Sequence, residues 1–156
     1  PGIVVAKEPP SDPPFNYGNV LPSSKRVVVV GGRGPNWVVD YYERTGQTPL
    51  KAYVEATEWG FMTQAGTKVA SLPATTDFTH NDLFVVMVFQ DSNGNFVLII
   101  YGLGWKGTFA GGILFKEVIA PSLAAYMGKA YVYRWTDDAK QDGVPQAAEI
   151  VPVYST

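Results

Sequence analysis

The sequence predicts an α/β (α+β) fold, in which a mixed β-sheet carries two main helices packed on it. Residues 27–30 are four consecutive valines and residues 96–101 form a second apolar run, as expected of strands buried on both faces. A glycine-rich turn follows each run, at 31–34 and at 102–107, and apolar residues then recur at helical spacing. The prediction therefore rests on two Rossmann-like strand–glycine-turn–helix units.

The chain divides into an arm and one domain. Residues 1–24 are rich in proline and are expected to form an extended arm or linker, whereas residues 25–156 are expected to form a single α/β domain. Within the arm, Ile3-Val4-Val5-Ala6 is a short β-prone piece. Two interpretations of this piece stay open: an edge strand in its own domain, or a strand lent to a neighbouring subunit.

The remaining elements follow from periodicity and turn residues. Apolar and polar residues alternate in several places, Asn-Gly at 93–94 marks a hairpin, and Pro121 is expected to kink or end the second helix. The expected elements after the first strand are a helix from Pro35 to Gly46, short strands within 51–71, strands at 83–89 and 96–101, a helix at 108–120 with a second piece at 122–127, and strands at 130–135 and 150–154.

Composition and charge exclude several classes of function. Only 17% of the 156 residues are charged, against the usual quarter, so an unusually neutral surface is expected, either for packing against other protein or as part of a larger chain. The net charge is −2 and no basic cluster is present, which argues against nucleic acid as a partner. There is no cysteine, hence no thiolate chemistry. We also expect no membrane span, because no uninterrupted apolar run approaches 18 residues.

The second glycine turn has the spacing of a nucleotide-binding motif. Gly102-x-Gly104-x-x-Gly107 lies between a strand and a helix, where helix N–H groups can hold a pyrophosphate, and Lys106 would add positive charge. However, the acidic residue expected about 20 positions later is missing, and two aromatic residues crowd the turn. The turn at 31–34 likewise lacks the ending of a P-loop. A nucleotide-binding enzyme is therefore an alternative, behind a purely structural role for both turns.

The acidic segment near the C-terminus partly matches a calcium loop. Counted from Asp138, positions 1, 5, 6 and 12 carry the residues that an EF-hand loop requires, but position 3 is Lys140, which cannot bind a cation. A looser Ca²⁺ site is the alternative to a solvated acidic loop. Its candidate ligands are Asp137, Asp138, Asp142 and Glu149.

Nucleophilic catalysis has little support in the sequence. His80 is the single histidine, so a Ser–His–Asp triad would depend on it entirely and a histidine-rich metal centre is excluded. Asp77 and Asp82 flank His80 in a predicted loop. The common outcome for such a residue is a surface histidine without catalytic function, so no catalytic residue is assigned.

Several segments together resemble the surface-layer (S-layer) proteins of archaea. The resemblance lies in the turn Val27-Val-Val-Val-Gly-Gly-Arg-Gly-Pro-Asn36, in Phe96-Val-Leu-Ile-Ile-Tyr-Gly102 with the Gly-Thr-x-Ala-Gly that opens the next helix, and in the closing segments 133–137 and 142–150. These segments cover most of residues 27–150. The chain departs from the pattern at Arg33, where proline is expected, and at Lys140 in the acidic loop.

The resemblance implies an exported, extracellular structural domain without enzyme activity. Its partners would be copies of itself or neighbouring domains of a surface layer or filament on the cell surface, and Ca²⁺ often supports such assemblies. The glycine turns would then be architectural, and the low charge would suit lateral contacts. Two alternatives remain: the nucleotide-binding enzyme described above and a calcium-stabilised binding module.

Overall fold

The computed structural model describes residues 26–138 and 141–156. The strands are β1 (Arg26–Val30), β2 (Leu50–Val54), β3 (Glu58–Thr63), β4 (Lys68–Pro73), β5 (Asn81–Gln90), β6 (Phe96–Gly102), β7 (Lys129–Thr136) and β8 (Ile150–Ser155). The helices are α1 (Trp37–Arg44) and α2 (Trp105–Leu114), and α2 continues through a π-helical turn over Phe115–Ile119 into 3₁₀ turns over Ala120–Tyr126. The arm and its β-prone piece, residues 3–6, lie outside the described residues.

The strands form two sheets where one mixed sheet was expected. The large sheet has the order β1-β6-β5-β7-β8, with β1 parallel to β6 and every other pair antiparallel. The segment between α1 and β5 forms its own antiparallel meander, β2-β3-β4. The expectation of a mixed α+β fold with two helices is confirmed, but the single sheet was wrong, because residues 50–73 pair only among themselves.

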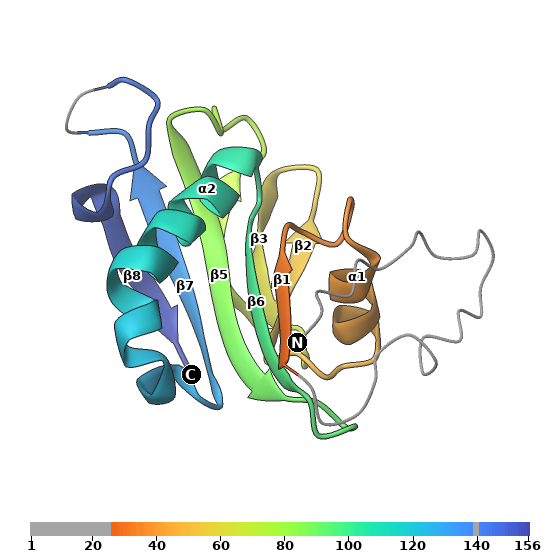
Figure 1. Cartoon of the computed structure of the whole chain (residues 1–156). Coiled ribbons are helices and arrows are strands. Elements are labelled where there is room, and N and C mark those ends of the chain that lie inside the picture. The colour runs from red at the N-terminus through yellow and green to blue at the C-terminus, as the bar shows by residue number, and fades with distance from the viewer. Residues whose placement is uncertain (1–25, 139–140) are drawn as a thin grey trace.

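The two helices cover opposite faces of the large sheet (Figure 1). On one face, α2 packs on alternate residues of β5 and β6, including Phe84, Val86 and Ile100. On the other face, α1 and the small sheet bury the intervening residues, including Val85 and Ile99. Both central strands are therefore buried on two sides, which explains why their sequences are continuous apolar runs without alternation.

Helix α2 begins earlier than its sequence indicated. The prediction placed its start near residue 108, whereas it begins at Trp105, with Gly104 as a cap that offers no side chain. The expected break is present: Ser122 has non-helical backbone angles, directly after Pro121. Contrary to the expectation of no membrane span, the whole run Trp105–Tyr126 is long and apolar enough to cross a membrane by length and composition. In this fold it lies along the sheet, held by the buried residues of α2.

The other expected turns are present. In the β5–β6 hairpin, the Asp91 carboxylate accepts N–H bonds from Asn93 and Asn95, and Gly94 has a φ of +77°. The Tyr42 hydroxyl of α1 also donates to Asp91, at 2.8 Å, so that the hairpin is fastened to the helix. Gly46 follows α1 with a φ of +70°, as expected of a glycine that ends a helix.

Candidate functional site

Both glycine turns lie at the same end of the large sheet, where the parallel strands β1 and β6 finish. Since β1 and β6 are parallel neighbours, with Val30 opposite Ile100, the turns that follow them come out side by side. The helices that they start then leave toward opposite faces (Figure 1). In open α/β sheets, such a divergence is where ligands commonly bind. The carboxyl ends of β1 and β6 are therefore where a binding site is expected.

The N–H groups of the second turn donate to a carboxylate of the same chain. Asp82, from the start of β5, accepts from Gly104 N–H (3.0 Å) and from Gly107 N–H (2.6 Å). Asp82 is fully buried. Burial raises the pKa of Asp82 to about 6, although the N–H bonds from Gly107 and Gly104 act in the opposite direction. A carboxylate thus holds the position where a nucleotide-binding turn would hold phosphate.

The three glycines of the motif are each explained by a close contact. A Cβ on Gly102 would lie 2.6 Å from the Cα of Gly107, so this pair lets the first turn of α2 rest on the end of β6. A Cβ on Gly104 would lie 3.0 Å from both the Asp82 carboxylate and the side chain of Phe78. The spacing of the motif therefore follows from packing of helix, strand and capping carboxylate.

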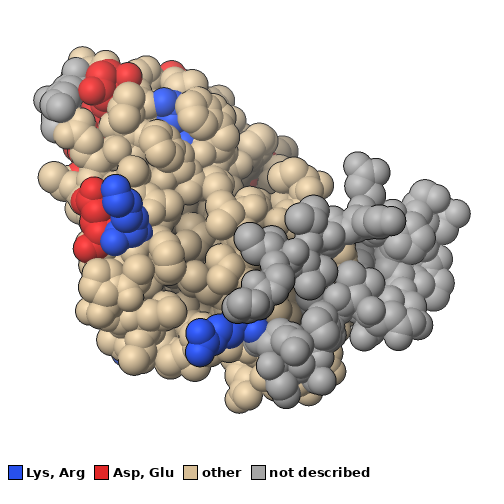
Figure 2. Space-filling view, in the orientation of Figure 1, with Lys and Arg blue, Asp and Glu red and all other residues tan. Residues whose placement is uncertain are grey.

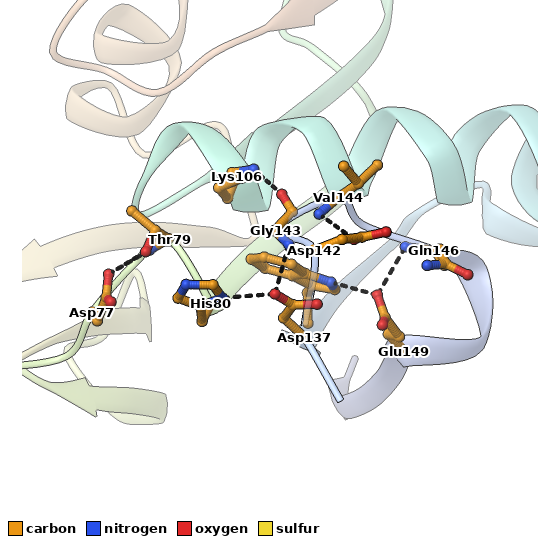
Figure 3. Close-up of polar contacts among 11 residues, drawn as sticks. Asp77, Thr79, His80, Lys106, Asp137, Asp142, Gly143, Val144, Gln146 and Glu149 are labelled. Atoms are coloured by element: carbon orange, nitrogen blue, oxygen red, sulfur yellow. Dashed lines mark hydrogen bonds and ion pairs between the residues drawn. The ribbon is translucent and has the colours of Figure 1, made fainter. Parts of the chain in front are cut away.

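Lys106, the proposed phosphate ligand, points to the acidic loop and away from the turn (Figure 3). Its ammonium group donates to the carbonyl oxygen of Gly143 and lies over the ring of Trp105, 4.4 Å from the centroid. The lysine thus joins the start of α2 to the loop that precedes β8. Of the four residues predicted to bind a cofactor, the three glycines come together with Asp82, and Lys106 is directed elsewhere.

The acidic loop is organised by hydrogen bonds of its own carboxylates (Figure 3). Asp137 accepts from Gly143 N–H at 2.7 Å, and Asp142 accepts from Val144 N–H at 2.9 Å. Glu149 accepts from the indole N–H of Trp135 and from Gln146 N–H, both at 3.0 Å. These carboxylates act as acceptors that fix the loop against β7. The fourth candidate ligand, Asp138, is exposed.

A metal centre does not emerge from these positions. Within residues 26–138 and 141–156, no three acidic or histidine side chains gather closely enough to hold a metal ion. One oxygen of Asp137, Oδ1, is buried without a hydrogen-bond partner. Calcium binding to this segment stays a prediction.

The histidine predicted to lie in a surface loop forms a pair with a buried aspartate. His80 Nδ1 lies 2.6 Å from Asp137 Oδ2; the His80 side chain is half-exposed, whereas that of Asp137 is buried. Burial alone would raise the pKa of Asp137, but the bonds from His80 and Gly143 outweigh it and hold that pKa below its usual value. Asp77 instead accepts from Thr79. Since no serine or threonine hydroxyl bonds to His80 in the described part of the chain, the pair lacks the nucleophile of a triad.

A second buried carboxylate lies behind the first glycine turn and was not predicted. Glu43 of α1 accepts a short hydrogen bond from the Tyr101 hydroxyl and a longer one, 3.4 Å, from Ala52 N–H. Burial raises the pKa of Glu43 to about 7, although the bonds from Tyr101 and Ala52 act in the opposite direction. The sequence signal was weak, because Glu43 lies in an otherwise ordinary helical pattern. Its position links α1, β2 and β6.

Comparisons with known protein families, with curated proteins and with solved structures find no match. The fold and the site define a mixed α+β domain in which the buried Asp82 holds the second glycine turn and the buried Glu43 joins α1 to β2 and β6. What can be said of its function therefore rests on the sequence and the geometry.

Proposed function

We propose that this chain is a non-catalytic structural domain of an exported, S-layer-like protein whose copies assemble into a lattice or filament outside the cell. The resemblance of residues 27–150 to archaeal surface-layer proteins is the origin of the proposal. The observation that best supports it is a group of large apolar side chains that are exposed on the surface of the described domain.

This surface follows α2 and the turns after it. Trp105 is 66% exposed and Phe109, one turn further along the helix, is 43% exposed. Val118 and Met127 are further exposed apolar side chains beyond α2, and the exposed Lys116 and Glu117 precede them in the chain. Figure 2 displays this side of the molecule, where uncharged residues occupy most of the view. Large exposed apolar areas on soluble domains commonly mark contact surfaces. Because Phe109 is only 43% exposed, burying the rest of its side chain would contribute about 1 kcal/mol.

The proposal is also consistent with the glycine turns. A Rossmann-like nucleotide-binding enzyme, the alternative, requires that the N–H groups of Gly104 and Gly107 be free to meet phosphate. Both already donate to Asp82, and a phosphate there would face the negative charge of that carboxylate. A structural function for the turns leaves the hydrogen bonds to Asp82 in place.

The experiment is to follow assembly of the full chain by size-exclusion chromatography and electron microscopy, with and without Ca²⁺. We expect large particles, and we expect the double variant Trp105→Ser/Phe109→Ser to weaken their formation. Val54→Ser is the matched control, because Val54 is 63% exposed but lies on the small sheet. Equal assembly of the double variant and the wild type would remove the α2 surface from the account, and a wild type that never assembles would contradict the proposed function.

A further inference from the structure

Strand β1 presents an unprotected sheet edge. Among the described residues it pairs only with β6. Gly31 N–H donates to the Ile100 carbonyl on β6 at 3.0 Å. Because N–H and C=O groups of alternate residues face the same neighbour in a parallel pair, those of Val28 and Val30 face away from β6. The carbonyl of Val30 receives a long bond, 3.4 Å, from the Asn36 side chain, which leaves Val28 at the centre of the open edge.

In the described part of the chain, β1 has few of the devices that usually protect edge strands: it is short, five residues, and begins with the charged Arg26. Its sequence, Arg-Val-Val-Val-Val, contains no proline and no internal charge, and the side chains of Val28 and Val30 are 65% and 57% exposed. The opposite edge strand, β8, contains Pro152 and a shift in its register with β7. Apolar edges without proline, bulge or internal charge are templates for pairing with another strand. Of the two edges of the large sheet, β1 is therefore the acceptor.

The sequence offers a β-prone segment outside the described residues. Ile3-Val4-Val5-Ala6 is the β-branched run of the arm, and the 19 residues between Ala6 and Arg26 include five prolines. We propose that residues 3–6 of one copy add as a strand to the β1 edge of a second copy. Backbone hydrogen bonds would hold the strand, and the exposed valines of β1 would pack beside it.

The composition of the connection favours a second copy over the same chain. Proline-rich segments adopt extended polyproline conformations that rise about 3.1 Å per residue, so 19 residues span up to roughly 60 Å. A folded domain the size of residues 25–156 has a radius of gyration of only about 14 Å. The arm can therefore reach well beyond its own domain. Because donor strand and acceptor edge are different parts of one chain, the contact is heterologous and can propagate along a filament.

This inference rests on the proposed function and names the contact that would join its subunits. It is tested with one donor-defective and one acceptor-defective full-length variant. Val4→Pro removes an N–H and breaks a strand at the arm. Val28→Lys places a charge on the edge at a side chain that is already exposed, so the fold should persist. Val54→Lys, on the edge strand β2 of the small sheet, is the matched control.

We expect the wild type and Val54→Lys to assemble, each defective variant alone to stay monomeric, and an equimolar mixture of the two to form a dimer that grows no further. Sedimentation velocity measures all of these, and urea unfolding checks that Val28→Lys is folded. Deletion of residues 1–6 provides a second donor-defective form. If both defective variants assemble like the wild type, the strand exchange is wrong while the proposed function stands. A mixture that stays monomeric would show pairing within one chain and overturn the inference, whereas a monomeric wild type would contradict the proposed function itself.

Discussion

Two adjacent glycines of α2 should respond in opposite ways to the same substitution. A Cβ on Gly111 would lie 2.5 Å from Cγ2 of Ile100 and 3.2 Å from the ring of Phe84, whereas a Cβ on Gly112 would meet nothing within 4 Å. Both residues lie within the helix, so replacement by alanine gains about 1 kcal/mol of helix propensity at either position. Any difference between the two variants therefore reports packing against the sheet.

The expected magnitudes follow from these contacts. Gly112→Ala should raise the free energy of unfolding by about 1 kcal/mol. Gly111→Ala should lower it by about 2 kcal/mol, because overpacking of a buried contact costs up to about 3 kcal/mol and outweighs the same gain. The difference of about 3 kcal/mol corresponds to roughly 10 °C in melting temperature.

Urea unfolding of monomeric protein, monitored by circular dichroism at several protein concentrations, measures both values. If Gly111→Ala were as stable as Gly112→Ala, the close approach of α2 to β6 would be wrong, and with it the structural explanation of the glycines.

Three further predictions concern the buried carboxylates and the proposed ligands. In the folded state Glu43 has a pKa of about 7, so the free energy of unfolding should fall by about 3 kcal/mol as the pH rises from 4.5 to 7. Urea titrations across this range should show a clearly smaller fall for Glu43→Gln. A fall identical to that of the wild type would refute the raised pKa of Glu43. Nucleotides should leave the melting temperature unchanged in a thermal-shift screen, because Asp82 occupies the turn; a shift that Gly104→Val abolishes would favour the enzyme. If the predicted Ca²⁺ site exists, chelator should lower the melting temperature of the domain and Asp142→Asn should reproduce the fall. An unchanged melting temperature would leave Asp137, Asp142 and Glu149 as acceptors of protein N–H bonds alone.

The strands and turns of the large sheet could be predicted because their signals are local. The run 96–101 is buried on both faces, as its continuous apolar sequence predicted, and Asn93-Gly94 specifies a tight turn. The four valines form a strand as expected, but burial on both faces was wrong for β1, because Val28 and Val30 on this edge strand are exposed. The separation of residues 50–73 into a second sheet depends on which strands pair. The alternation of apolar and polar residues within one strand does not specify its neighbours.

The candidate site depended on contacts between residues far apart in sequence. Asp82 reaches the turn 22 positions later, and His80 meets Asp137 across 57 positions. Helix α2 also begins earlier than expected because of a distant residue. Asp82 accepts the N–H bond of Gly107 that the side chain of a local N-cap residue would otherwise accept. Periodicity and motif spacing carry no information about such partners. The two aromatic residues expected to crowd the turn, Trp105 and Phe109, are instead exposed.

The central claim, that this domain exists to contact copies of itself, is tested most directly by sedimentation velocity of the full-length wild-type chain over a wide range of concentration. We expect species that grow beyond a dimer as concentration rises, as mass action requires of an open-ended contact. A single sharp monomer boundary at every concentration, with and without Ca²⁺, would contradict it.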